Sequence, residues 1–150
     1  MAAALEQAGR TTEIAAVAVS SVAETVVPVD EAGEPLAHAI AWFDTRSLPQ
    51  SQELEKALGR ERIFAIAGLD NNPIFSVAKV MWYRQHAPEV FARARKWLGV
   101  ADYVNWKLAG VFVTDYTHAS RTMALDLEKC AWSQEILDAA GLSADAFPDI

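Results

Sequence analysis

The side chains best suited to bind a polar ligand lie where apolar segments of the sequence end. Glu24 separates the apolar run Ile14–Val19 from the run Thr25–Val29, and a carboxylate at such a junction can accept hydrogen bonds from ligand hydroxyls. Most glutamates of soluble proteins are exposed to solvent. From the residues alone, a solvated Glu at a strand end is therefore the simpler interpretation of Glu24.

A second candidate site closes the next apolar segment, Leu36–Trp42. Trp42, Asp44 and Arg46 alternate along an extended chain, which puts an aromatic plane and a carboxylate on one face. The C–H face of a sugar packs on such a ring while its hydroxyls meet the acid. The alternative packs Trp42 in the core and leaves Asp44 and Arg46 as a local ion pair, and the residues alone slightly favour it.

The remaining polar clusters predict structural roles. Residues 114–122 are dense in hydroxyl side chains, which favours a capped turn over a binding loop because such side chains readily bond to nearby backbone N–H groups. Asp102 is predicted to cap the helix that follows it. Trp82, Trp97, Trp106 and Trp132 occupy periodic apolar positions and are predicted to be core anchors.

Several classes of function are disfavoured by motifs and composition. The sequence contains no glycine-rich phosphate loop and no nucleophile elbow, and its three histidines and single cysteine lack metal-ligand spacing. We therefore predict no metal site. A net charge of −7 disfavours nucleic acid as a partner. No apolar run reaches the roughly 18 residues of a bilayer span, so we expect no membrane association and a cytoplasmic protein.

The first part of the sequence predicts a helix and a meander of strands. Ala2–Ala8 has helical composition, and Ile14–Val19, Thr25–Val29 and Leu36–Trp42 are predicted strands, the last two joined by a turn at residues 30–35. Pro28 lacks an N–H group, which predicts an edge position or a bulge in its strand.

Helical periodicity dominates the second part. A helix is predicted from Ser47 or Pro49, and two apolar stripes predict further half-buried helices near residues 74–82 and 100–108. Short strands are expected at 111–113 and 122–127, and a last helix at 132–140. The order predicts an α/β or α+β domain, but the strands are few, so we expect the domain to be incomplete at both ends.

Four segments together resemble the FGGY carbohydrate kinases, with glycerol kinases among the nearer patterns. They match in order and spacing over nearly the whole chain, and they are residues 17–25 (VAVSSVAET), 39–46 (AIAWFDTR), 73–79 (PIFSVAK) and 113–122 (VTDYTHASRT). The resemblance implies the α/β, ribonuclease H-like fold of the actin-like ATPase superfamily. It also implies an enzyme that uses ATP and Mg²⁺ to phosphorylate one hydroxyl of a sugar or polyol.

The resemblance changes the interpretation of the two candidate sites. It implies that Glu24 binds substrate hydroxyls and that Trp42 packs against substrate carbons. It places Asp44 and Arg46 beside the site, where they either contact the substrate or hold the strand end. Glycerol kinases have an arginine where Ala23 stands and a tyrosine where Ile74 stands. Loss of two polar contacts predicts a substrate larger than glycerol, a pentose, hexose or related polyol.

The resemblance also implies that residues 1–150 are part of the N-terminal, sugar-binding domain. The family's phosphate-binding D-x-G-T-[TS] segment is expected before Met1, and the catalytic base aspartate and the C-terminal ATP-binding domain after Ile150. We therefore expect no kinase activity from residues 1–150 alone. A noncatalytic sugar-binding or regulatory module with the same fold is the alternative. An unpaired edge of the strand at Ile14–Val19 predicts self-association as a homo-oligomer.

Overall fold

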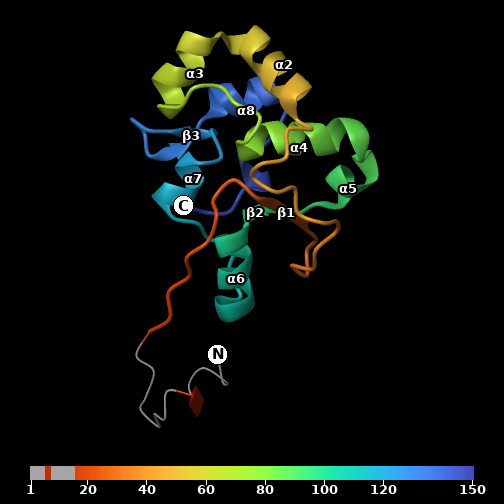
Figure 1. The fold of residues 1–150 in the computed structure, drawn as a ribbon, viewed down its shortest axis with the longest axis vertical. Helices are drawn as coiled ribbons and strands as arrows, with labels where there is room; N and C mark the ends of the chain where they lie inside the picture. The colour runs from red at the N-terminus through yellow and green to blue at the C-terminus, as the bar shows by residue number, and fades with distance from the viewer. Residues whose placement is uncertain (1–5, 8–15) are drawn as a thin grey trace.

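The computed structural model describes residues 6–7 and 16–150 and combines two two-stranded sheets, β1–β2 and β3–β4, with several helices (Figure 1). The elements follow in the order β1 Val26–Val29, α2 Leu48–Leu58, α3 Arg60–Ala67, α4 Ser76–His86, α5 Pro88–Arg93, β2 Lys96–Gly99, α6 Val100–Ala109, α7 Tyr116–Ser120, β3 Leu125–Asp126, β4 Ala131–Trp132, α8 Gln134–Ala140 and the 3₁₀ helix η1 Ala144–Ala146. The predicted mixture of helices and strands is confirmed.

The strands β1 and β2 form an antiparallel pair that separates two apolar layers. In this pair Val26 lies opposite Gly99 and Pro28 opposite Trp97. Alternate side chains of a strand point to opposite faces, so Val26 and Trp97 join one cluster of buried residues while Val27 and Leu98 join another. The sheet is thus covered on both sides.

The predicted meander is only partly formed after β1. The turn is present, with the carboxylate of Asp30 accepting the N–H groups of Ala32 and Glu34. The predicted strand Leu36–Trp42 is wrong, since this segment meets β1 only through isolated bridges at Pro35 and Ile40. β1 pairs with β2 along one side and is bridged at Val26 and Val29 on the other, so the edge position predicted from Pro28 is not confirmed.

The larger apolar layer lies between the sheet and the helices α2, α3, α4 and α8. Leu54, Ile63, Val80 and Ile136 come from these four helices and are fully buried. The predicted helix beginning near Ser47 is confirmed as α2, with Pro49 in its first turn. Removing such apolar side chains from water is the main stabilising term of a core of this kind.

On the other side of the sheet α6 covers β1 and β2 (Figure 1). Tyr103 and Trp106 pack there, but Val104 and Leu108, which were predicted to be half buried, are exposed. Gly110 ends α6 in the left-handed conformation, at φ 72°. Glycine adopts this conformation without the steric cost that a Cβ atom imposes.

Several predicted strands and boundaries are corrected. Residues 111–113 form no strand, and Val113 makes only an isolated bridge to Asp149. The strand predicted at 122–127 shrinks to β3, and the last helix begins at Gln134 rather than Trp132. β3 is two residues long, and so short a ladder leaves little periodic pattern in the sequence.

The first predicted elements lie mostly outside the described residues. Only Glu6 and Gln7 of the helix predicted at 2–8 are described, and both are helical. Of the strand predicted at Ile14–Val19, residues 16–19 are described and form no strand. The edge argument for self-association therefore has no support in this part of the chain, and the oligomer stays a prediction. No described helix has both the length and the apolar character needed to cross a bilayer.

Candidate functional site

The centre of the candidate site is the buried ammonium group of Lys79 on α4. Its Nζ atom donates to two main-chain carbonyl oxygens, 2.7 Å from that of Glu24 and 2.9 Å from that of Ala41. The residue is completely buried. Burial lowers the pKa of Lys79 from 10.5 to about 8, against the opposing charges of Glu24 and Asp44. Lys79 thereby links the segment that contains Glu24 to the segment that contains Trp42, Asp44 and Arg46.

Glu24 is held on its side-chain end by Arg121, the residue that closes α7. The Nε atom of Arg121 donates to Oε1 of Glu24 at 2.7 Å, and Nη2 donates to the same oxygen. The Glu24 side chain is only 13% exposed. The interpretation of Glu24 as a solvated side chain at a strand end is therefore wrong. A carboxylate held mostly out of water by an arginine is an ordered hydrogen-bond acceptor.

Trp42 lies next to Glu24 through the main chain. Its N–H group donates to Oγ1 of Thr25 at 3.1 Å, and Thr25 directly follows Glu24. The Trp42 side chain is 47% exposed and meets Phe43 edge to face, with ring centroids 5.6 Å apart. An indole with an open face is unlike a core anchor, so the core alternative for Trp42 is wrong.

Asp44 and Arg46 form the local ion pair that the sequence offered as an alternative. The Nη2 atom of Arg46 lies 2.7 Å from Oδ2 of Asp44, and its main-chain N–H donates to Oδ1 at 2.9 Å. These bonds from Arg46 lower the pKa of Asp44. The guanidinium of Arg46 also lies over the Trp82 ring, 5.0 Å from its centroid. Whether the pair also contacts a substrate stays a prediction.

The hydroxyl-rich stretch 114–122 was predicted to be a capped turn and instead contains the short capped helix α7, so its predicted structural role is confirmed but not its form. Asp115 is the N-cap of α7, and its carboxylate accepts the His118 N–H at 2.9 Å. Asp102 was predicted as the N-cap of α6, which is wrong: the N-cap is Gly99, and Asp102 lies inside the first turn and accepts the Gly99 N–H at 2.8 Å. Burial is the main cause of the raised pKa of Asp102.

Sequence reasoning singled out neither Lys79 nor Arg121 as part of the site. Their partners lie 55 and 97 residues away along the chain, so no local pattern could pair them. The one available signal was their presence inside the matched segments 73–79 and 113–122. Phe75, over whose ring the Arg121 guanidinium lies at 5.1 Å, was missed for the same reason.

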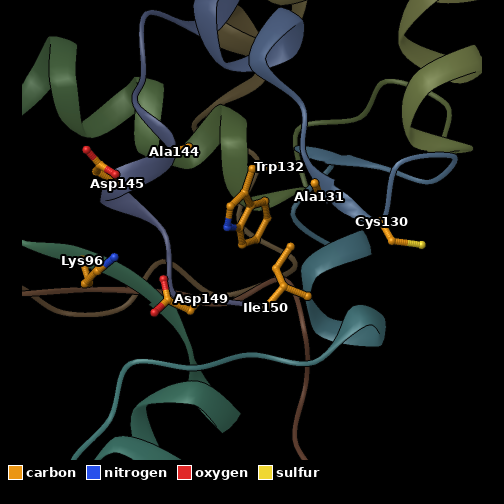
Figure 2. Close-up of a pocket in the computed structure, with 8 residues that line it drawn as sticks. All are labelled: Lys96, Cys130, Ala131, Trp132, Ala144, Asp145, Asp149 and Ile150. Carbon is orange, nitrogen blue, oxygen red and sulfur yellow. The ribbon is translucent and has the colours of Figure 1, made fainter.

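An open pocket of about 350 Å³ lies elsewhere, beside β2 and the last residues of the chain (Figure 2). Figure 2 shows Lys96 and Asp149 close together at one side of the pocket and Trp132 on the side toward Ala131. Two of its polar groups serve the fold, because Lys96 Nζ donates to the Phe147 carbonyl and Trp132 Nε1 to that of Pro148. None of the predicted site residues lines this pocket.

The whole chain matches one family model. Residues 1–150 fit the model described as the FGGY family of carbohydrate kinases, N-terminal domain. The chain belongs to the FGGY family of carbohydrate kinases.

Relatives within this family carry several kinase names. The chain is 36% identical over 146 residues to a probable glycerol kinase of Caenorhabditis elegans, covering 92% of this chain and 29% of the relative. It is 31% identical over 138 residues to a xylulose kinase of Lactococcus lactis, covering 92% of this chain and 27% of the relative. The chain thus spans less than a third of the curated relatives it matches.

Solved FGGY kinases share the fold. A gluconate kinase and a ligand-bound xylulose kinase, both from Lactobacillus acidophilus, each superpose with a TM-score of 0.87 at 28% identity. Each alignment covers 97% of this chain and 30% of the neighbour. The predicted ribonuclease H-like, actin-like fold class is confirmed.

The described residues do not fit the ATP and Mg²⁺ that the family uses. Within residues 6–7 and 16–150, no three His, Cys, Asp or Glu side chains come together as metal ligands. The sequence also lacks a glycine-rich phosphate loop. We therefore assign no step of phosphoryl transfer to groups of this chain that would hold nucleotide or metal.

Proposed function

We propose that residues 1–150 supply the acceptor-binding part of an ATP-dependent carbohydrate kinase, which transfers the γ-phosphoryl group to a hydroxyl of a sugar or polyol. The observation that carries the proposal is the junction of Glu24 and Trp42. The Lys79 ammonium joins the two segments at the main-chain carbonyls of Glu24 and Ala41. One segment carries a mostly buried carboxylate and the other carries the half-exposed Trp42. Family membership supplies the class of reaction.

The two side chains have complementary tasks in this proposal. The Glu24 carboxylate accepts hydrogen bonds from acceptor hydroxyls, while the Trp42 ring packs against acceptor carbons. Together they fix the orientation of the sugar, which is the main contribution that an acceptor site can make to phosphoryl transfer. Asp44 and Arg46 hold the segment that carries Trp42, because their hydrogen bonds already engage one another.

The acceptor is proposed to be a pentose, a hexose or a related polyol rather than glycerol. The glycerol kinases that this sequence resembles have an arginine at the position of Ala23 and a tyrosine at the position of Ile74. The side chains of Ala23 and Ile74 carry no hydrogen-bonding group. Ile74 instead packs against the buried core. A site without these two donors gains less from a three-carbon acceptor and leaves room for a longer one.

Phosphoryl transfer itself is proposed to require parts of the protein beyond residues 1–150. In this proposal the ATP-binding domain, the phosphate-binding segment and the base aspartate belong to other parts of the protein. We expect residues 1–150 alone to show no acceptor-dependent ATP turnover, because donor, metal and base must be aligned with the acceptor.

The proposal is tested by an acceptor panel. The full-length gene product is assayed with ATP, Mg²⁺ and separate polyols, pentoses and hexoses, and residues 1–150 are assayed in parallel. We expect turnover by the full-length product with at least one pentose or hexose in preference to glycerol, and none by residues 1–150. Preferred turnover of glycerol would contradict the substrate class. Sugar binding without turnover of any acceptor would favour a noncatalytic module.

A further inference from the structure

We propose that Arg121 is a positioning residue that makes Glu24 a one-sided acceptor, so that a single carboxylate oxygen meets the sugar. The inference rests on the proposed function. Both nitrogen atoms that Arg121 uses, Nε and Nη2, donate to Oε1 of Glu24. Oε1 is thereby occupied before any ligand arrives.

The second oxygen of Glu24 is left for the ligand. Within residues 6–7 and 16–150, every hydrogen bond to the Glu24 carboxylate ends on Oε1, while Lys79 bonds to the main-chain carbonyl of the same residue. Oε2 is therefore the acceptor with spare capacity in the described structure. Because Glu24 is held at its main-chain carbonyl by Lys79 and at Oε1 by Arg121, its Oε2 atom points in a fixed direction.

Arg121 is itself held at two points and its neighbour Thr122 at a third, which makes Arg121 suitable for this task. Its guanidinium lies over the Phe75 ring, and its own N–H donates to the His118 carbonyl at the end of α7. The next residue, Thr122, accepts the N–H of Val77 at 3.0 Å and so joins the end of α7 to the start of α4. The position of the guanidinium is thus set by two helices.

The chemistry requires arginine rather than any cation. A guanidinium can direct two N–H groups at one oxygen while its plane stacks on a ring, whereas an ammonium acts as a point charge on a flexible stem. The pair also lies close to Trp42 through Glu24 and Thr25. Release of the carboxylate would let it turn, which weakens acceptor binding without touching the nucleotide site.

The test compares Arg121→Met and Arg121→Lys in the full-length gene product. We expect Arg121→Met to raise the acceptor KM by about tenfold or more and to leave the ATP KM unchanged, with Arg121→Lys recovering part of the loss. In a Glu24→Gln background, Arg121→Met should add little, because the carboxylate it orients is already gone. Arg62→Met, which breaks the exposed pair with Glu135 between α3 and α8, is the matched control and should change neither KM.

Acceptor affinity is also measured by calorimetry with the preferred sugar, which does not depend on turnover. No turnover of any acceptor by wild type or variants, together with an Arg121-dependent acceptor affinity, would overturn the proposed kinase function but support Arg121 as the positioning residue. An effect of Glu24→Gln on acceptor KM with none of Arg121→Met would overturn this inference alone. Equal changes in the acceptor and ATP constants would also overturn it, since that pattern indicates general damage to the fold. Wild-type protein that binds no acceptor would overturn both proposals.

Discussion

Two arginine–carboxylate pairs flank the site, and they differ in how their carboxylates are used. Arg121 and Arg46 each lie over an aromatic ring, at 5.1 Å from the centroid of Phe75 and 5.0 Å from that of Trp82. Arg121 reaches 97 residues to bond to one oxygen of Glu24. Arg46 bonds to both oxygens of Asp44, two residues away. The Arg121–Glu24 pair leaves one carboxylate oxygen without a hydrogen bond in the described structure, whereas both oxygens of Asp44 are bonded to Arg46.

We assign acceptor binding to Glu24 and a structural role to Asp44. Asp44 also accepts the main-chain N–H of Arg46, so its carboxylate closes a tight turn just after Trp42. Exposed ion pairs of this kind stabilise a fold by only about 0–1 kcal/mol. The Glu24 pair is less exposed and joins distant segments, so under the proposed function we expect its loss to weaken acceptor binding.

Lys79 stands between the two pairs, and its removal should have the largest effect. We expect Lys79→Met to lower the free energy of unfolding of the chain by about 2 kcal/mol, because the carbonyls of Glu24 and Ala41 lose their donor. In the full-length product the acceptor KM should rise by about 100-fold as the two segments separate. Urea unfolding and steady-state kinetics measure the two effects.

Lys56→Met is the control for that experiment, because Lys56 is an exposed residue of α2 outside the site. It should change the unfolding free energy by less than about 0.5 kcal/mol. An acceptor KM unaltered by Lys79→Met would mean that the ammonium stabilises the fold without positioning the site, and would remove the link between the two pairs.

The lowered pKa of Lys79 gives an effect of intermediate size. Burial lowers this pKa from 10.5 to about 8, so between these pH values the unfolded chain binds more protons than the folded one. The free energy of unfolding should therefore rise with pH across this window, by at most about 1.4 kcal/mol per pH unit. Urea unfolding at several pH values from about 8 to 9.5 should give a flatter profile for Lys79→Met than for wild type.

The pH range from about 8 to 9.5 lies below the range in which Tyr83 loses its proton, since burial raises the pKa of its phenol above 10.0. Tyr83 therefore adds little to the pH dependence of the unfolding free energy there. Lys96, whose pKa burial lowers, acts in the same direction as Lys79 in both proteins and cancels in the difference. Parallel profiles for the two proteins would contradict a buried ammonium at residue 79.

The sequence predicted best those features that neighbouring residues determine. The helix α2 with Pro49 in its first turn and the turn at residues 30–35 both follow from local chemistry, and both are present. The local ion pair of Asp44 and Arg46 was recognised for the same reason. Predictions that depended on distant partners were less successful.

The strand predicted at Leu36–Trp42 shows where local patterns fail. Its residues are apolar and suited to a strand, but only isolated bridges join them to β1. The site had the same difficulty: Glu24 and Trp42 were identified by resemblance to a family, and their local environments favoured other interpretations. Lys79 and Arg121, which hold these residues in place, are recognisable only when the chain is folded.

The most direct test of the different roles of the two carboxylates is to measure the acceptor KM of Glu24→Gln and Asp44→Asn side by side in the full-length gene product. Both changes remove one charge and keep the side-chain shape. We predict a rise of about tenfold or more for Glu24→Gln, whose free oxygen meets the sugar, and less than about twofold for Asp44→Asn. An equal or larger effect of Asp44→Asn would contradict the account, because it would place the substrate on the carboxylate that we assign to the turn.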